Sequence, residues 1–314
     1  MCLKRLLVGQ FILDKFNFKS ILMNSRTVLL LLLTFFTLNI YAQTAPASTD
    51  IFVVDMKEKK GKITLDKWKN VTNRNGYDNQ PAFLNNDYIL YSSFSNGQND
   101  IMIHDLYEGK STNLTKTNTS EYSPYPIPGF SSFATVRVEE DGTQRLWMFQ
   151  MDGKSKPTIV FEKIAPVGYF AWNADNEVLM FVLGTPITAV IANAEKVNDE
   201  IVTSNIGRTI RLIPGTNDFA FERTEESGEK VIYKLDSKTR EFSNIITKPE
   251  GSADWTITQE GTFITSLGTK LHMYNPKNHS NWQELSDLGS MASKGITRMA
   301  VSQENDKLAI VINQ

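Results

Sequence analysis

Cysteine is almost absent from this 314-residue sequence, and the single one, Cys2, stands next to the first residue. The chain beyond residue 42 therefore cannot form disulfides, use a thiolate nucleophile or bind zinc through cysteine. Histidine is also scarce, and His104, His272 and His279 do not have the spacing of a metal site. We expect His104 and His272 to be ordinary strand residues, and no metal ligand is predicted.

A basic face is missing as well. The formal net charge is −2, and because residues 1–42 carry +4, the remainder carries −6. A mildly acidic body argues against nucleic-acid binding, which needs a basic surface. There is no G-x-S-x-G motif, and Ser131 and Ser132 in "GFSSF" have the wrong spacing and context for a nucleophile. No catalytic residue is predicted.

The clearest local signal is a leader. Residues 23–42 read "MNSRTVLLLLLTFFTLNIYA", a short basic region with Arg26, an apolar run and a small residue at the end. This pattern predicts a signal peptide cleaved after Ala42, and residues 1–22 are interpreted as an upstream extension. The apolar run is shorter than the ~20 residues of a membrane-spanning helix. We therefore expect a periplasmic or secreted protein of a Gram-negative bacterium, without stable membrane insertion.

An internal repeat dominates the rest of the chain. Five turn glycines, each between two apolar β-rich runs, are spaced by 45, 42, 44 and 40 residues: Gly97, Gly142, Gly184, Gly228 and Gly268. The apolar strand before each hairpin repeats with about the same period, at Phe83, Pro126, Trp172, Leu212, Ile257 and Val301. Asn96-Gly97 and Asp141-Gly142 are typical of type I′ hairpin turns.

The strand after each turn repeats too. "DIMIHD" (100–105) is echoed by "RLWMFQ" (145–150), "TAVIAN" (188–193), "VIYKLD" (231–236) and "KLHMYN" (270–275). A period of about 44 residues with four short strands per unit predicts the blades of an all-β propeller. Six first strands precede only five complete hairpins. "DIFVVDMKEKKGKITLDKW" (50–68) supplies the missing strands, so we expect the N-terminal strands to complete the sixth blade and close the ring of a single domain over 43–314.

Residues 70–106 resemble the repeat of the TolB-type propellers, also called WD-repeat-like or PD40 propellers. The matching positions are Val71-Thr72, Tyr77, Asp78, Pro81, Phe83, Tyr91, Gly97, Asp100 and Ile101. The second unit keeps Leu114-Thr115, Tyr122, Pro124 and Gly142, whereas later units lose the motif. The resemblance implies six blades, a periplasmic role and protein contacts at one mouth of the central channel.

The loops that lead into the innermost strands gather at one channel mouth. They carry the predicted binding residues Tyr77, Asp78, Tyr122, Tyr125, Arg208, Arg211, Trp255 and Arg298. Tyr, Trp and Arg are the residue types enriched at binding hot spots. The prediction is a monomeric, non-catalytic propeller without a cofactor, which binds a protein, peptide or glycan of the cell envelope.

Three alternatives stay open at this point. The tyrosines and Trp255 could pack between blades instead. The protein could be a propeller hydrolase or lactonase with a channel Ca²⁺ held by acids such as Asp78 and Asp254. It could also be a structural propeller with no small ligand.

Overall fold

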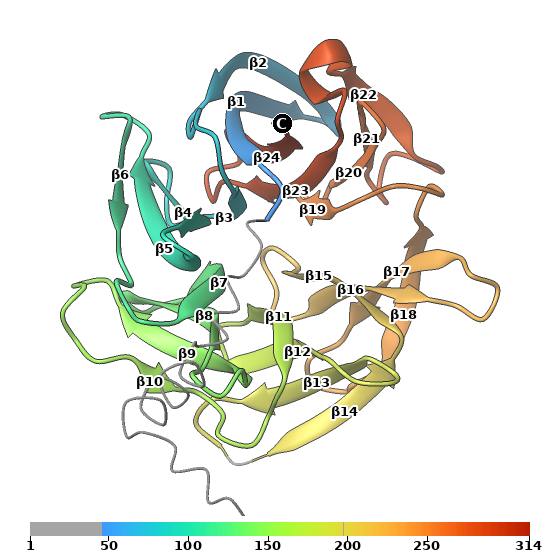
Figure 1. Ribbon diagram of the computed structural model, residues 1–314. Coiled ribbons are helices and arrows are strands. Elements are labelled where there is room, and N and C mark those ends of the chain that lie inside the picture. The colour runs from blue at the N-terminus through green and yellow to red at the C-terminus, as the bar shows by residue number, and fades with distance from the viewer. Residues whose placement is uncertain (1–45, 197) are drawn as a thin grey trace, which may run out of the picture. The chain divides into compact units, whose positions relative to one another are not determined.

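In the part of the chain that the structure describes, twenty-four β-strands form six four-stranded sheets around a central axis (Figure 1). The computed structural model describes residues 46–196 and 198–314. The predicted extension and signal peptide lie outside these residues. Within them the only helix is the single 3-10 turn η1 (Gly289–Ala292), and no helix is long and apolar enough to cross a membrane. The six-bladed propeller expected from the repeat is confirmed.

Neighbouring strands within every sheet are antiparallel, and the blades are numbered here in chain order. Blade 1 contains β3 (Asp78–Phe83), β4 (Tyr88–Ser95), β5 (Gln98–Asp105) and β6 (Lys110–Asn113). Blade 2 contains β7 (Ser120–Pro126), β8 (Ser132–Val138), β9 (Gln144–Gln150) and β10 (Thr158–Ile159). Blade 3 contains β11 (Val167–Trp172), β12 (Glu177–Val182), β13 (Thr188–Asn193) and β14 (Asp199–Ser204). Blade 4 contains β15 (Ile206–Leu212), β16 (Phe219–Thr224), β17 (Lys230–Leu235) and β18 (Phe242–Thr247). Blade 5 contains β19 (Trp255–Ile257), β20 (Phe263–Leu267), β21 (Lys270–Tyr274) and β22 (Gln283–Asp287). Blade 6 contains β23 (Ile296–Val301), β24 (Lys307–Asn313), β1 (Thr49–Lys59) and β2 (Lys62–Asn70).

The sixth blade joins the two ends of the described chain. Its strand order is β2-β1-β24-β23, and β1 pairs with β24 from Thr49 opposite Asn313 to Asp55 opposite Lys307. The stretch that repeats "DIMIHD" at residues 50–55 therefore takes the third-strand position in this blade. This pairing gives the backbone groups of β24 a partner on each side, so no open sheet edge remains there.

The turns follow the repeat, with one difference in detail. Asn96 and Gly97 both have positive φ, 53° and 88°, as a type I′ turn requires. Gly142 also has positive φ, but Asp141 does not, and Gly142 N–H donates to Glu139 O at 2.8 Å. The predicted type I′ turn at 141–142 is wrong, because the longer loop between β8 and β9 forms a turn that ends in one left-handed glycine.

The core is distributed between the blades. Six clusters of buried apolar side chains each join two neighbouring blades, including one between blades 5 and 6 and one between blades 6 and 1. In the latter, Ile51 and Val311 pack against Phe83 and Ile89. The inner strands are buried on both faces, whereas outer strands such as β14 are largely exposed. Because each sheet packs on two neighbours, the first strands of all six blades are held around one axis.

Candidate binding channel

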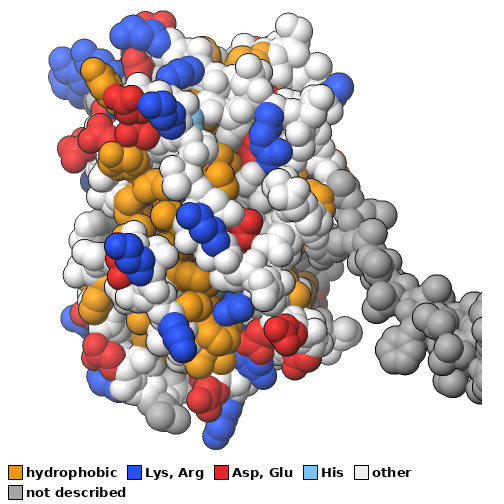
Figure 2. Space-filling view, turned by 60° about the vertical axis from the view of Figure 1, so that its left-hand side comes forward, with side chains coloured by type: hydrophobic (Ala, Val, Ile, Leu, Met, Phe, Trp, Pro, Cys, Tyr) orange, Lys and Arg blue, Asp and Glu red, His pale blue; other side chains and the backbone are white. Residues whose placement is uncertain are grey.

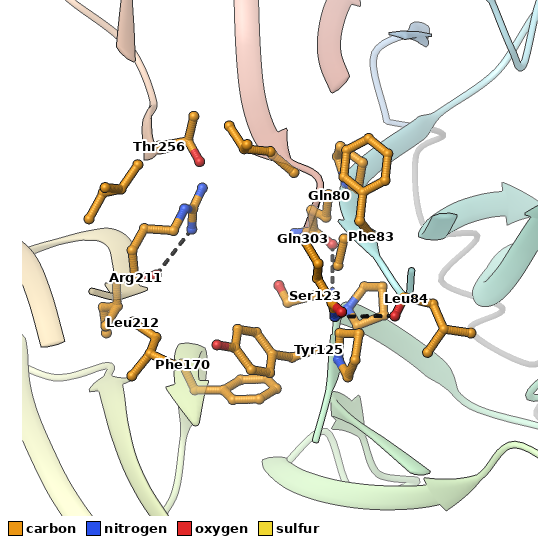
Figure 3. A pocket seen from close by; sticks show the side chains of 18 of the residues that line it. Gln80, Phe83, Leu84, Ser123, Tyr125, Phe170, Arg211, Leu212, Thr256 and Gln303 are labelled. Atoms are coloured by element: carbon orange, nitrogen blue, oxygen red, sulfur yellow. Dashed lines mark hydrogen bonds between the residues drawn. The ribbon is translucent and has the colours of Figure 1, made fainter. Parts of the chain in front are cut away.

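The first strands of the six blades line a cavity of about 780 Å³ on the axis of the propeller (Figure 3). These strands are β3, β7, β11, β15, β19 and β23. The volume is within the range of ordinary small-ligand sites, about 300 to 1,000 Å³. Figure 3 shows Arg211 extending into the cavity, opposite Gln80 and Ser123, with the rings of Tyr125 and Phe170 side by side below it.

The cavity has two chemically different ends. All six first strands run in the same direction along the axis, so residues near their starts lie at one end and residues after their ends lie at the other. Tyr169, Arg208 and Arg298 are near the starts, and this part is called the arginine end. The lining beyond the strand ends contains five apolar side chains, and this part is called the apolar end: Leu84, Ile127, Pro128, Phe130 and Pro214. The polar side chains of Ser131, Gln259 and Gln303 also line it.

A single carboxylate, that of Asp254, lines the described part of the cavity. It accepts hydrogen bonds from Thr209 Oγ1 at 2.5 Å and from Met299 N–H at 3.0 Å, and Arg211 Nη2 lies 3.3 Å from its Oδ2. Burial alone would raise the pKa of Asp254, but Arg211, Arg298 and Arg208 together hold it below the ordinary value. Asp254 is therefore a charged structural partner of the arginines.

Arg208 and Arg298 converge on one backbone oxygen at the arginine end. Arg208 Nη2 donates to Thr297 O at 3.1 Å, and Arg298 Nη1 donates to the same oxygen at 2.9 Å. Arg298 Nη2 also donates to the Tyr169 hydroxyl at 3.0 Å, and its guanidinium carbon lies 5.3 Å from the centre of the Tyr169 ring. Loss of water around the guanidinium and the charge of Arg298 both lower the pKa of Arg208. The two like charges thus lie close together.

The structure places the eight predicted binding residues in different surroundings. Four line the cavity: Tyr125, Arg208, Arg211 and Arg298. Tyr77 is not among the lining residues; burial raises the pKa of Tyr77 to about 12, although the charges of Arg298 and Arg208 act in the opposite direction. Tyr122 is half-buried, and its hydroxyl accepts a hydrogen bond from Asn99 Nδ2 at 2.8 Å.

The other two predicted residues, Trp255 and Asp78, are fully buried and do not line the cavity. Trp255 is 0% exposed and packs between blades 4 and 5, with its ring 5.9 Å from that of Phe263. Asp78 is also 0% exposed, and it binds Arg74 Nη2 at 2.7 Å and Ser93 Oγ at 2.7 Å. Neither side chain reaches the surface, so their contact with a partner stays a prediction that this burial does not favour.

Several lining residues were missed, and the repeat contains the signal that identifies them. The position three residues before the end of each first strand faces the cavity in five of six blades: Gln80, Ser123, Tyr169, Asp254 and Arg298. Blade 4 departs from this pattern: Thr209 occupies the position and is buried, and Arg208 lines the cavity in its place. Phe130 lies in a loop outside this pattern.

The described residues contain no candidate metal centre. No group of three or more His, Asp or Glu side chains suited to a metal ion occurs among residues 46–196 and 198–314. His104 and His272 lie in the third strands β5 and β21, away from the first strands that line the cavity. Outside the channel, acidic and basic side chains are interspersed on the face shown in Figure 2. The described cavity lining, in contrast, contains three arginines and one carboxylate.

Comparisons with known proteins match the fold but not the sequence. No family model and no curated protein matches the chain. A TolB-type protein from Agrobacterium tumefaciens has a TM-score of 0.66 at 11% identity, over 86% of this chain and 99% of its own. A chain of the nidogen–laminin complex gives 0.57 at 10% identity, covering 84% and 98%. An oligogalacturonate lyase from Vibrio parahaemolyticus gives 0.56 at 12%, covering 78% and 80%.

The protein is thus a six-bladed β-propeller whose central channel is lined by the first strands of the blades. Its fold is that of the TolB proteins.

Proposed function

We propose that this protein is an exported binding propeller of the bacterial cell envelope, which recognises a protein, peptide or glycan partner through its channel and catalyses no reaction. The observation that supports the proposal is the composition of the cavity lining. Arg208, Arg211 and Arg298 share it with the rings of Tyr125 and Tyr169. Such side chains combine contact area with hydrogen-bond donors, which is why they are frequent at binding hot spots.

The location rests on the predicted signal peptide at residues 23–42. The likeness in fold to TolB proteins agrees with an envelope location, and a propeller of this fold occurs in the nidogen–laminin complex. The likeness at 10 to 12% identity is one of architecture, so it supports a binding propeller without identifying the partner.

The enzymatic alternative has less support. A channel Ca²⁺ needs several oxygen ligands, usually with carboxylates among them. The described lining offers only the carboxylate of Asp254, which is already bound to Arg211, Thr209 and the backbone of Met299. A cation there would also be repelled by the guanidinium groups. The similarity to oligogalacturonate lyase is therefore treated as a similarity of fold.

The proposal is tested by photo-crosslinking in the native cell. A benzophenone amino acid replaces Phe130, which is 56% exposed at the apolar end, or Tyr107, which is 89% exposed in the β5–β6 turn away from the cavity. We expect a discrete envelope adduct from position 130 and none from position 107. Equal adducts at both positions, or none at position 130, would contradict binding through the channel.

A further inference from the structure

The arginine end of the channel holds more positive charge than its surroundings neutralise. Among residues 46–196 and 198–314, neither Arg208 nor Arg298 has a carboxylate within salt-bridge distance. Both donate to Thr297 O, so the two donor nitrogens lie within two hydrogen-bond lengths of each other. Two guanidinium groups at such a distance repel each other, and an anion between them would remove that repulsion.

The neighbouring groups favour an anion-binding role for Arg208 and Arg298 over a structural ion-pair network. Asp254 acts on both arginines, but it is committed to Arg211 and to the Met299 N–H. Glu222 also acts on Arg208, but it is paired with Lys248 at 2.5 Å. Arg208 comes from blade 4 and Arg298 from blade 6, so the two charges are brought together from blades that are not neighbours. A guanidinium presents planar paired donors that match a carboxylate, and a cleft with low-dielectric walls strengthens the attraction.

The apolar end indicates what else the ligand contains. Phe130 exposes 56% of its surface there, beside Ile127, Pro128 and Leu84. From Arg298, three residues before the end of its first strand, to the first residue beyond a strand end is a rise of four residues. At roughly 3.3 Å per residue this is about 13 Å, so a ligand that contacts both ends must be extended. A sugar ring would pack a C–H face on Phe130, whereas apolar peptide side chains would bury Ile127, Pro128 and Leu84 as well.

We propose that the channel binds an extended acidic peptide, with a carboxylate held between Arg208 and Arg298 and apolar side chains against the Phe130 end. This inference rests on the proposed function, because it names the ligand of the same channel. Charge complementarity selects the acidic group, and the separation of the two ends selects an extended chain. An acidic oligosaccharide is the competing ligand, and the test includes it.

The experiment uses two matched pools of acetylated, amidated pentapeptides on the immobilised protein. Each peptide in the first pool has one Asp or Glu at either end and randomised apolar residues elsewhere. The second pool has Asn or Gln in place of the acid. A charge-assisted hydrogen-bonded pair corresponds to about a tenfold to hundredfold change in affinity. We expect retention of the acidic pool over the amide pool by that factor, weakening as salt is added.

Variants separate charge recognition from folding. Arg208→Gln and Arg298→Gln should each remove the preference for the acidic pool, and a cooperative thermal transition in each variant shows that it still folds. Arg298→Lys should keep part of the preference. Lys110→Gln, whose side chain is 78% exposed outside the cavity, should leave retention of both pools unchanged.

Each other outcome overturns the inference. Equal retention of the two pools, or a preference that survives in the Arg208→Gln/Arg298→Gln double variant, would show that the arginines do not select an anion. Retention of neither pool, with oligogalacturonate retained, would replace the peptide by an acidic glycan. In these cases a crosslink from position 130 in cells would still support channel binding, so the two proposals fail separately.

Discussion

Glu121 is a buried acid whose ionisation should make the stability of the propeller depend on pH. It is 0% exposed in β7, next to Thr117 Oγ1 at 2.5 Å and Thr119 Oγ1 at 3.2 Å. Arg137 Nε lies 3.7 Å from its Oε1. Burial raises the pKa of Glu121 to about 7, although these threonines and Arg137 favour the charged form. Desolvation is the larger effect.

The sign of the pH dependence follows from this direction. In the unfolded chain the Glu121 carboxyl loses its proton near the ordinary glutamate pKa of 4.5, but in the folded protein it does so near 7. Between these values the folded state binds more protons, so the free energy of unfolding falls as the pH rises and then stays constant above about pH 7. The difference between the two pKa values corresponds to about 3 kcal/mol.

Urea unfolding of the wild type and of Glu121→Gln, followed by circular dichroism from pH 4 to pH 8, measures this effect. Subtraction of the two curves removes the contribution of the other carboxyl groups. We expect the wild type to lose about 3 kcal/mol relative to Glu121→Gln across this range. Glu108→Gln, at a side chain that is 54% exposed, should show no such trend. A constant difference between wild type and Glu121→Gln would refute the reasoning.

Three further predictions concern the core, the closing strands and the channel. Trp255→Ala should lower the free energy of unfolding by about 3 to 5 kcal/mol in urea, because the indole is fully buried, and a loss below about 1 kcal/mol would contradict its core position. Deletion of residues 46–70 removes β1 and β2 and leaves β24 as an open edge; size-exclusion chromatography should show aggregation, whereas a monomer with a cooperative transition would contradict this. Millimolar Ca²⁺ added after EDTA should leave the calorimetric midpoint unchanged, because Asp254 is the single carboxylate of the described lining and lies among arginines. A clear rise of the midpoint would support the metal-dependent enzyme instead.

The fold was predictable because a propeller repeats one physical problem six times. Each blade must supply an inner strand, a tight turn and an outer hairpin, so turn residues such as Gly97 and Gly268 recur with a fixed period. The half unit at residues 50–68 could be assigned to the last blade from the count alone. The turn at Asp141 was not predictable in the same way, because turn type depends on loop length as well as on the two central residues.

The site was predictable only in part, because residue type does not determine where a side chain points. Trp255 and Arg298 both occur near the start of a first strand, yet one is buried between blades and the other faces the channel. The sharing of Thr297 O by Arg208 and Arg298 depends on the reach of two long side chains from blades that are not neighbours. No periodicity in the sequence reports such a contact.

The most direct test of the channel as the binding surface combines the two experiments proposed above. The native partner is crosslinked through the benzophenone residue at position 130, in envelope preparations, with increasing amounts of the retained acidic peptide. Binding in one channel predicts that the adduct disappears as the peptide saturates its site, and that Arg208→Gln abolishes this competition. An adduct that persists unchanged at saturating peptide would contradict the account, because partner and peptide would then occupy different surfaces.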